Sequence, residues 1–181
     1  MKPQNGKNVL IGISGGIAAY KVPELVRSFV KESFAVKCVL TQSAQKFVTP
    51  LTLQTLSKNK VYCSMFEGSE WELDHIVLAN WADIFIVAPA TADTIAKLAC
   101  GSAQDLLSCT ALAFKKPILV CPAMNTDMWN HQATVANCSR LKEFGYNIVQ
   151  PQDGELACGV LGIGRLADIE VILKRAVELL K

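Results

Sequence analysis

Apolar residues form two alternating patterns along the chain. Short, mostly apolar runs, typical of parallel strands covered on both faces, are separated by longer stretches in which apolar residues recur every three or four positions. The runs predict strands at residues 9–14, 35–41, 84–90, 118–122 and 147–149. The periodic stretches predict helices at residues 18–30, 92–100, 106–114, 134–144 and 169–180.

Strands that alternate with helices at this spacing predict a doubly wound α/β sheet, Rossmann-like or flavodoxin-like, with about four to six parallel strands. The sequence contains neither an internal repeat nor a linker-like stretch, so residues 1–181 are expected to form a single domain. Residues 150–168 contain four glycines and little periodicity, which predicts a long loop or flap. A long loop in a compact domain is usually functional.

Composition and charge narrow the class of protein. The 181 residues are 51% hydrophobic and 19% charged, the net charge is +2, and the sequence contains no block of like charges. A disordered chain is excluded, and no nucleic-acid partner is expected, because the basic stripe that such partners require is missing. The apolar runs are far shorter than the ~20 residues of a membrane helix, so no membrane association is expected. Seven cysteines without a C-x-x-C pair predict reduced thiols in a cytoplasmic protein without a metal site.

A glycine-rich turn lies between the first predicted strand and the first predicted helix. Residues 12–19 read Gly-Ile-Ser-Gly-Gly-Ile-Ala-Ala, which allows an anion to approach the backbone at a helix N-terminus. Neither G-x-G-x-x-G nor G-K-[ST] is present, and the second strand ends in Thr41, Gln42 and Ser43 rather than in an acidic residue. These features favour a mononucleotide phosphate. A glycine turn without a ligand is the alternative.

Two further segments, residues 88–94 and 121–129, follow predicted buried strands at the sheet edge where open α/β folds bind ligands. Their alanines leave room for a flat ring against the backbone. The alternative for Thr91, Asp93 and Thr94 is capping of the next helix, which is compatible with ligand contact. Met128 and Trp129 are candidates for ordinary core residues, whereas Asn125 carries an amide that needs polar partners.

Three side chains are candidates for acid–base chemistry. His75 and His131 are the two histidines of the chain, and a lone histidine is more often structural than catalytic. Cys158 lies in the predicted flap, where a solvent-reachable thiol can donate a proton; the alternative is that it packs the flap. The other six cysteines fall in or beside apolar elements and are expected to be packing residues.

Taken together, these motifs resemble the flavin-containing cysteine decarboxylases, over residues 9 to about 168. P-x-M-N-x-x-M-W is specific to that family, far more so than a glycine loop. The motifs that carry the resemblance are Ser14-Gly15-Gly16-Ile17-Ala18-Ala19-Tyr20-Lys21, His75, residues 88–94, Pro122-Ala123-Met124-Asn125-x-x-Met128-Trp129 and Ala157-Cys158-Gly159.

The resemblance implies FMN as cofactor and 4′-phosphopantothenoylcysteine, a small molecule of coenzyme A synthesis, as substrate. It implies oxidation of the cysteinyl thiol, loss of the carboxylate as CO2 and re-reduction of the resulting ene-thiolate, with the redox chemistry carried by the cofactor. His75 is implied in oxidation and decarboxylation, Asn125 in binding the carboxylate, and Cys158 as the acid of the final reduction. Met128 and Ala157 are implied as further substrate contacts.

The resemblance also implies where FMN binds and how the chain assembles. The phosphate is expected on the glycine loop and the ring beside the two later strand ends, with the contacts Ser14, Gly15, Gly16, Ile17, Ala18, Thr41, Ser43, Phe47, Ala88, Pro89, Ala90, Thr91, Thr94, Cys121, Ala123 and Met124. The implied assembly is a homotrimer or a dodecamer of trimers. The chain departs from the family in two respects. Asp93 stands where many relatives have Asn. Bacterial relatives often carry a second, ligase half, and none follows Lys181, so both a monofunctional protein and one excised domain remain possible interpretations.

Three alternatives remain beside this interpretation. A peptidyl-cysteine decarboxylase shares the histidine, the asparagine and the flavin, although the 156–159 flap resembles the coenzyme A branch. A flavin prenyltransferase shares the fold but not residues 122–129. A non-catalytic flavin-binding regulatory subunit typically adds a long acidic tail, which this sequence lacks.

Overall fold

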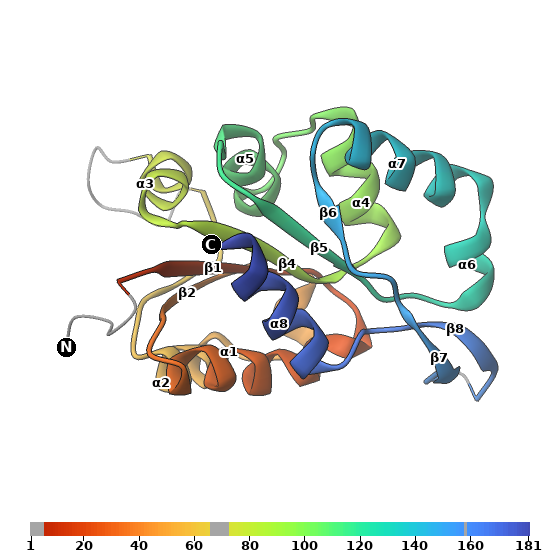
Figure 1. Ribbon diagram of the computed structural model, residues 1–181, viewed down its shortest axis with the longest axis horizontal. Helices are drawn as coiled ribbons and strands as arrows, with labels where there is room; N and C mark the ends of the chain where they lie inside the picture. Colours follow the sequence, from red (N-terminus) through yellow and green to blue (C-terminus); the bar gives the residue numbers. More distant parts are fainter. Residues whose placement is uncertain (1–5, 66–72, 158) are drawn as a thin grey trace.

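The computed structural model describes residues 6–65, 73–157 and 159–181. Six parallel strands form one sheet in the order β3-β2-β1-β4-β5-β6 (Figure 1), which confirms the predicted doubly wound α/β fold. The strands are β1 (Asn8–Ile13), β2 (Ala35–Leu40), β3 (Val61–Tyr62), β4 (Ile84–Ala90), β5 (Ile118–Pro122) and β6 (Asn147–Ile148). The strand order reverses between β1 and β4, so the carboxyl ends of these two strands diverge into a crevice.

Helices cover both faces of the sheet (Figure 1). One face carries α1 (Val22–Lys31), α2 (Pro50–Ser57) and α8 (Ile169–Leu179). The other carries α3 (Asp74–Trp81), α4 (Ala92–Cys100), α5 (Leu106–Ala113) and α7 (Gln132–Glu143). Three short helices follow the carboxyl ends of β1, β2 and β5, namely η1 (Ile17–Lys21), η2 (Ala44–Lys46) and α6 (Thr126–Asn130). Among the described residues, none of the helices is long and apolar enough to cross a membrane.

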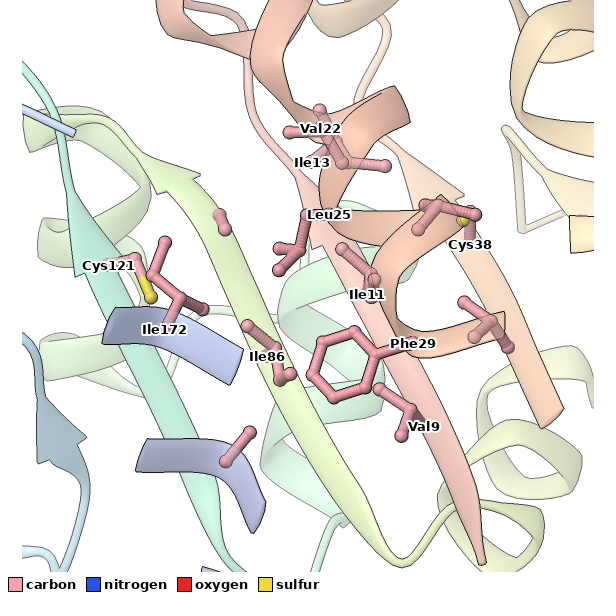
Figure 2. Packing of buried hydrophobic residues seen from close by; sticks show 14 of the residues in the cluster. Val9, Ile11, Ile13, Val22, Leu25, Phe29, Cys38, Ile86, Cys121 and Ile172 are labelled. Atoms are coloured by element: carbon pink, nitrogen blue, oxygen red, sulfur yellow. The ribbon is translucent and has the colours of Figure 1, made fainter. Parts of the chain in front are cut away.

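The alternation of side chains along each strand divides the core into two layers. Val9, Ile11 and Ile13 of β1 are fully buried on the face that carries Phe29 of α1 and Ile172 of α8 (Figure 2). The neighbouring strand positions point into the second layer, under α3, α4, α5 and α7. All seven residues of β4 are buried, which explains its uninterrupted apolar run.

The sequence pattern missed η2, α2 and β3 on the β2 side of the sheet. The leucines of α2 do not share one buried face, because Leu53 is buried and Leu51 is 72% exposed. The helix begins after Thr49, whose hydroxyl accepts a hydrogen bond from the Thr52 N–H. Strand β3 has only two residues, too few to show a period. The predicted first helix also divides in two, into η1 and α1, and Pro23 lies in the first turn of α1 as expected.

Residues 150–168, expected to form a long loop or flap, are not a loop throughout. This segment contains an antiparallel hairpin of β7 (Gln152–Glu155) and β8 (Leu161–Arg165). Three of the glycines lie inside its strands, where they remove the apolar alternation by which a strand is recognised. Figure 1 shows the hairpin at the same end of the molecule as α6.

Candidate functional site

A cavity of about 570 Å³ lies at the carboxyl ends of β1, β4 and β5, a volume typical of small-molecule sites. Its lining comes from the loops after these strands, from the β7–β8 hairpin and from the residues that follow each strand of the hairpin. The lining consists of Gly15, Gly16, Ile17, Ala18, Tyr20, Lys21, Thr91, Ala92, Ala123, Met124, Asn125, Met128, Glu155, Leu156, Ala157, Gly164, Arg165 and Leu166. The structure therefore brings together the glycine loop and the two later strand ends that the sequence singled out.

The glycine loop is packed so closely that side chains are excluded from it. A Cβ atom on Gly15 would overlap Ser43, which follows β2, and one on Gly16 would lie 3.3 Å from Thr91 Cγ2. Glycine at these two positions lets the backbone after β1 lie directly against the backbone after β2 and β4. The wall of the cavity at this point is therefore bare backbone, as an anion-binding loop requires.

Ser14 holds the glycine loop against the end of β4. Its side chain is 1% exposed, and its hydroxyl donates to the Pro89 carbonyl at 2.6 Å. The Ser14 Oγ in turn accepts a hydrogen bond from the Thr91 N–H at 3.0 Å. The single hydroxyl proton is thus committed to Pro89. In this arrangement Ser14 positions the two loops that line the cavity and does not itself line it.

The β4 end combines helix capping with contact to the cavity. Thr91 caps α4, since its hydroxyl accepts a hydrogen bond from the Thr94 N–H at 3.3 Å, and it lines the cavity as well. Thr94 is 4% exposed and lies behind it, 3.1 Å from the Thr91 hydroxyl. Ala88 and Ala90 are completely buried, so their side chains support the loop from inside the sheet.

Asn125 and Met128 border the cavity from α6. The Asn125 side chain caps this helix by accepting a hydrogen bond from the Asp127 N–H at 2.8 Å. Met128 is 49% exposed on the cavity wall, so it is not a core residue, whereas Trp129 is half-buried against the second core layer. The asparagine is therefore fixed in orientation by its own helix.

The hairpin is seated on the loop after β5 through two glycines of β8. A Cβ on Gly164 would overlap the Met124 carbonyl oxygen, and one on Gly162 would lie 3.2 Å from Thr126 Cγ2. The Gly164 carbonyl in turn accepts a hydrogen bond from the Met124 N–H at 2.9 Å. This close approach of two backbones places Leu156, Ala157 and Arg165 on the cavity.

Gly164→Ala should therefore destabilise the protein strongly. At φ +151° alanine is strained, at a cost of roughly 1–3 kcal/mol, and its Cβ meets a backbone oxygen that cannot move aside. Gly145→Ala is the matched control: Gly145 also has a positive φ, +85°, but a Cβ placed on it would have no described atom within 4 Å apart from its chain neighbours. Urea unfolding should show the larger loss for Gly164→Ala, and equal losses would contradict the close seat of the hairpin.

Several expected site residues lie outside the cavity lining. Ser43 is behind Gly15, the Thr41 hydroxyl accepts a hydrogen bond from the Ala44 N–H at 3.2 Å, and Phe47 is 43% exposed nearby. His75 is half-buried in the first turn of α3, away from the lining. Cys158 falls outside the described residues.

Two other polar groups have structural roles. Cys121 is 1% exposed in the core layer that contains Ile172 of α8 (Figure 2), and burial raises the pKa of its thiol, so its side chain belongs to the core and only its backbone lies near the site. His131 caps α7 with Nδ1, which accepts a hydrogen bond from the Ala133 N–H at 3.2 Å. Within the described ranges, no cluster of three His, Cys, Asp or Glu side chains is arranged to hold a metal ion.

The structure adds residues that the sequence analysis did not place in the site. Tyr20 and Lys21 stand at the end of the glycine-loop motif, and that position was the signal available for them. Glu155 and Arg165 carry no local motif, because they reach the cavity only through the hairpin.

A doubly wound sheet with a glycine-lined cavity at its switch point defines the class of α/β proteins that bind nucleotide-like ligands at the strand ends. Within that class, the model of the Flavoprotein family matches residues 1–181. The chain belongs to the Flavoprotein family.

Two curated relatives are similar over most of this chain. It is 47% identical over 173 residues to the coenzyme A biosynthesis bifunctional protein CoaBC of Bacillus subtilis (strain 168), covering 95% of this chain and 43% of that protein. It is 43% identical over 175 residues to a probable phosphopantothenoylcysteine decarboxylase of Streptococcus mutans serotype c, covering 95% of this chain and 98% of that protein. The chain thus spans less than half the length of the bifunctional relative and nearly all of the other.

Two solved structures share the fold. A cysteine-to-serine variant of PPC decarboxylase, complexed with pantothenoylaminoethenethiol, matches with a TM-score of 0.85 and 32% identity over 95% of this chain and 97% of that one. The FMN-dependent cysteine decarboxylase SpaF matches with a TM-score of 0.85 and 27% identity over 99% of both chains.

Proposed function

We propose that this protein is an FMN-dependent decarboxylase of 4′-phosphopantothenoylcysteine, forming 4′-phosphopantetheine in coenzyme A biosynthesis. The observation that carries the proposal is the cavity, which joins the glycine loop, the Pro122–Trp129 motif and the residues beside Cys158 in one site. The similarity to a probable phosphopantothenoylcysteine decarboxylase over 98% of that relative's length supports the same substrate.

The residues present fit FMN. The close packing around Gly15 and Gly16 leaves bare backbone for a phosphate, and Ala92 and Ala123 leave room for a flat ring beside the ends of β4 and β5. Bound FMN supplies reversible two-electron redox chemistry at the carbon that bears the substrate thiol. We assign the phosphate to residues 15–18, and the ring to the wall formed by residues 91–92 and 123–124.

The chain's own residues orient the substrate and move its protons. Asn125, held by its bond from Asp127, would direct its amide N–H toward the substrate carboxylate, and Met128 would cover the apolar part of the substrate. Cys158 follows the cavity-lining Ala157 in the sequence and would donate the proton that completes the product. The hairpin would exclude water from the reaction. His75 is assigned to the oxidation and decarboxylation steps on the resemblance alone.

The experiment that tests the function is CO2 release by the purified chain with FMN. 4′-Phosphopantothenoylcysteine should be decarboxylated to 4′-phosphopantetheine, whereas a peptide with a C-terminal cysteine should be a poor substrate. The protein should retain FMN and not FAD. Preferential turnover of the peptide would overturn the proposed substrate, and an absence of flavin binding would overturn the proposed chemistry.

We further propose a homotrimer or a dodecamer of trimers, in the cytoplasm. Ile17, Tyr20, Phe47 and Leu51 are all between 43% and 72% exposed and come from the segments that follow β1 and β2, beside the cavity. A contiguous exposed apolar patch commonly marks a protein interface, and we propose that these side chains form one. Light scattering should give at least the mass of a trimer, and an FMN-binding monomer would contradict the assembly.

A further inference from the structure

Arg165 is a basic residue on the cavity wall that the proposed roles leave unused. One edge of its guanidinium is tied down: Nη2 donates to Gln152 Oε1 at 2.9 Å and lies 3.7 Å from Asp168 Oδ1. Its Nε atom is buried and has no hydrogen-bond partner in the part of the chain that the structure describes. The Arg165 side chain as a whole is 41% exposed, so an anionic ligand can reach guanidinium donors that these contacts leave available.

The hairpin determines which way Arg165 points. Successive side chains of a strand lie on opposite faces, and Gly164 lies against the backbone of Met124 and Asn125. Arg165 therefore lies on the other face, where it is paired with Gln152 of β7 and where a Cβ on Gly154 would be only 3.4 Å from its Nη1. Glycine at position 154 leaves room for the guanidinium.

Two groups that can bind negative charge line the same cavity. One is the neutral amide of Asn125, which follows β5, and the other is the guanidinium of Arg165, on β8 of the hairpin. The glycine loop, to which the cofactor phosphate is assigned, lines the cavity from the segment after β1. A substrate that carries both a carboxylate and a phosphate thus has one of these groups available for each charge.

We propose that Arg165 binds the phosphate of the substrate and so selects 4′-phosphopantothenoylcysteine over its dephosphorylated form; this inference rests on the proposed function. A planar guanidinium matches the oxygens of a phosphate in charge and geometry. The phosphate is remote from the carbon that loses CO2. A contact that is equally strong in the ground state and in the transition state lowers KM without raising kcat, and we expect this of the contact between Arg165 and the phosphate.

The test uses two substrates that differ only in the phosphate, 4′-phosphopantothenoylcysteine and pantothenoylcysteine, with FMN-loaded protein. For Arg165→Gln we expect KM of the phosphorylated substrate to rise about 10- to 100-fold, the effect of one lost charge-assisted contact, while kcat stays within about threefold. For pantothenoylcysteine, kcat/KM should not change. Arg165→Lys should give an intermediate KM, because it keeps the charge and loses the planar fork.

Two controls accompany these measurements. Arg27→Gln removes an exposed arginine from α1 and should behave as the wild type toward both substrates. FMN affinity, measured by quenching of flavin fluorescence, should be unchanged in Arg165→Gln.

An equal loss on both substrates would overturn the inference, because Arg165 would then serve the carboxylate or the hairpin. A loss of FMN affinity would overturn it in favour of the cofactor phosphate. A wild type that releases CO2 from neither substrate would reject the proposed function, and the inference with it. An active wild type whose preference for the phosphorylated substrate survives Arg165→Gln would reject the inference alone.

Discussion

Asn125→Asp should abolish decarboxylation by preventing the substrate from binding. The new carboxylate would face the substrate carboxylate, and two such charges ~4 Å apart at an effective dielectric of ~20 repel by about 4 kcal/mol. That energy corresponds to about a thousandfold loss of affinity. The fold should survive, because aspartate caps a helix as well as asparagine does and keeps the oxygen that accepts from the Asp127 N–H.

The measurement is substrate binding to the FMN-loaded variant, together with CO2 release and thermal unfolding. Asn130→Asp is the matched control, since it makes the same change at an exposed position of the same short helix. It should retain nearly full activity. If Asn125→Asp bound substrate normally at an unchanged melting temperature, Asn125 would not contact the carboxylate.

Cys158→Ala should separate the two halves of the reaction. The variant should still release CO2, because the thiol is assigned only to the proton transfer that follows. Formation of 4′-phosphopantetheine should fall by about 10²- to 10⁴-fold, the usual contribution of a general acid, and an ene-thiol product should accumulate with the flavin bleached.

Two comparisons make the Cys158 result specific. Cys100→Ala changes an exposed thiol on α4 and should turn over normally. His75→Asn should fail earlier, without CO2 release and without bleaching of the flavin. Accumulation of 4′-phosphopantetheine by Cys158→Ala at the wild-type rate would refute the assigned role and leave the cysteine as a packing residue of the flap.

The sequence by itself determined the strands of the sheet other than β3 and the sheet edge at which the cavity lies. Runs such as the one in β4 are apolar throughout because both faces of a central parallel strand are covered, so composition alone reveals them. Glycines after β1 and small residues after β4 and β5 marked the strand ends, and the order of strands and helices then placed those ends together. The Asn125 motif was visible because its residues are close in the chain.

Only the tertiary structure decided what each polar group near those ends does. Ser14 carries a hydroxyl that suits a phosphate ligand, but this hydroxyl donates its proton to the carbonyl of Pro89, 75 residues away. The sequence did not reveal the hairpin because glycines interrupt the apolar alternation of its strands. Gly164 leaves room for the backbone of Met124, and Gly154 leaves room for the guanidinium of Arg165. The periodicity of apolar residues shows which face of a helix or strand is buried. It does not show which distant backbone or charged side chain packs against a glycine.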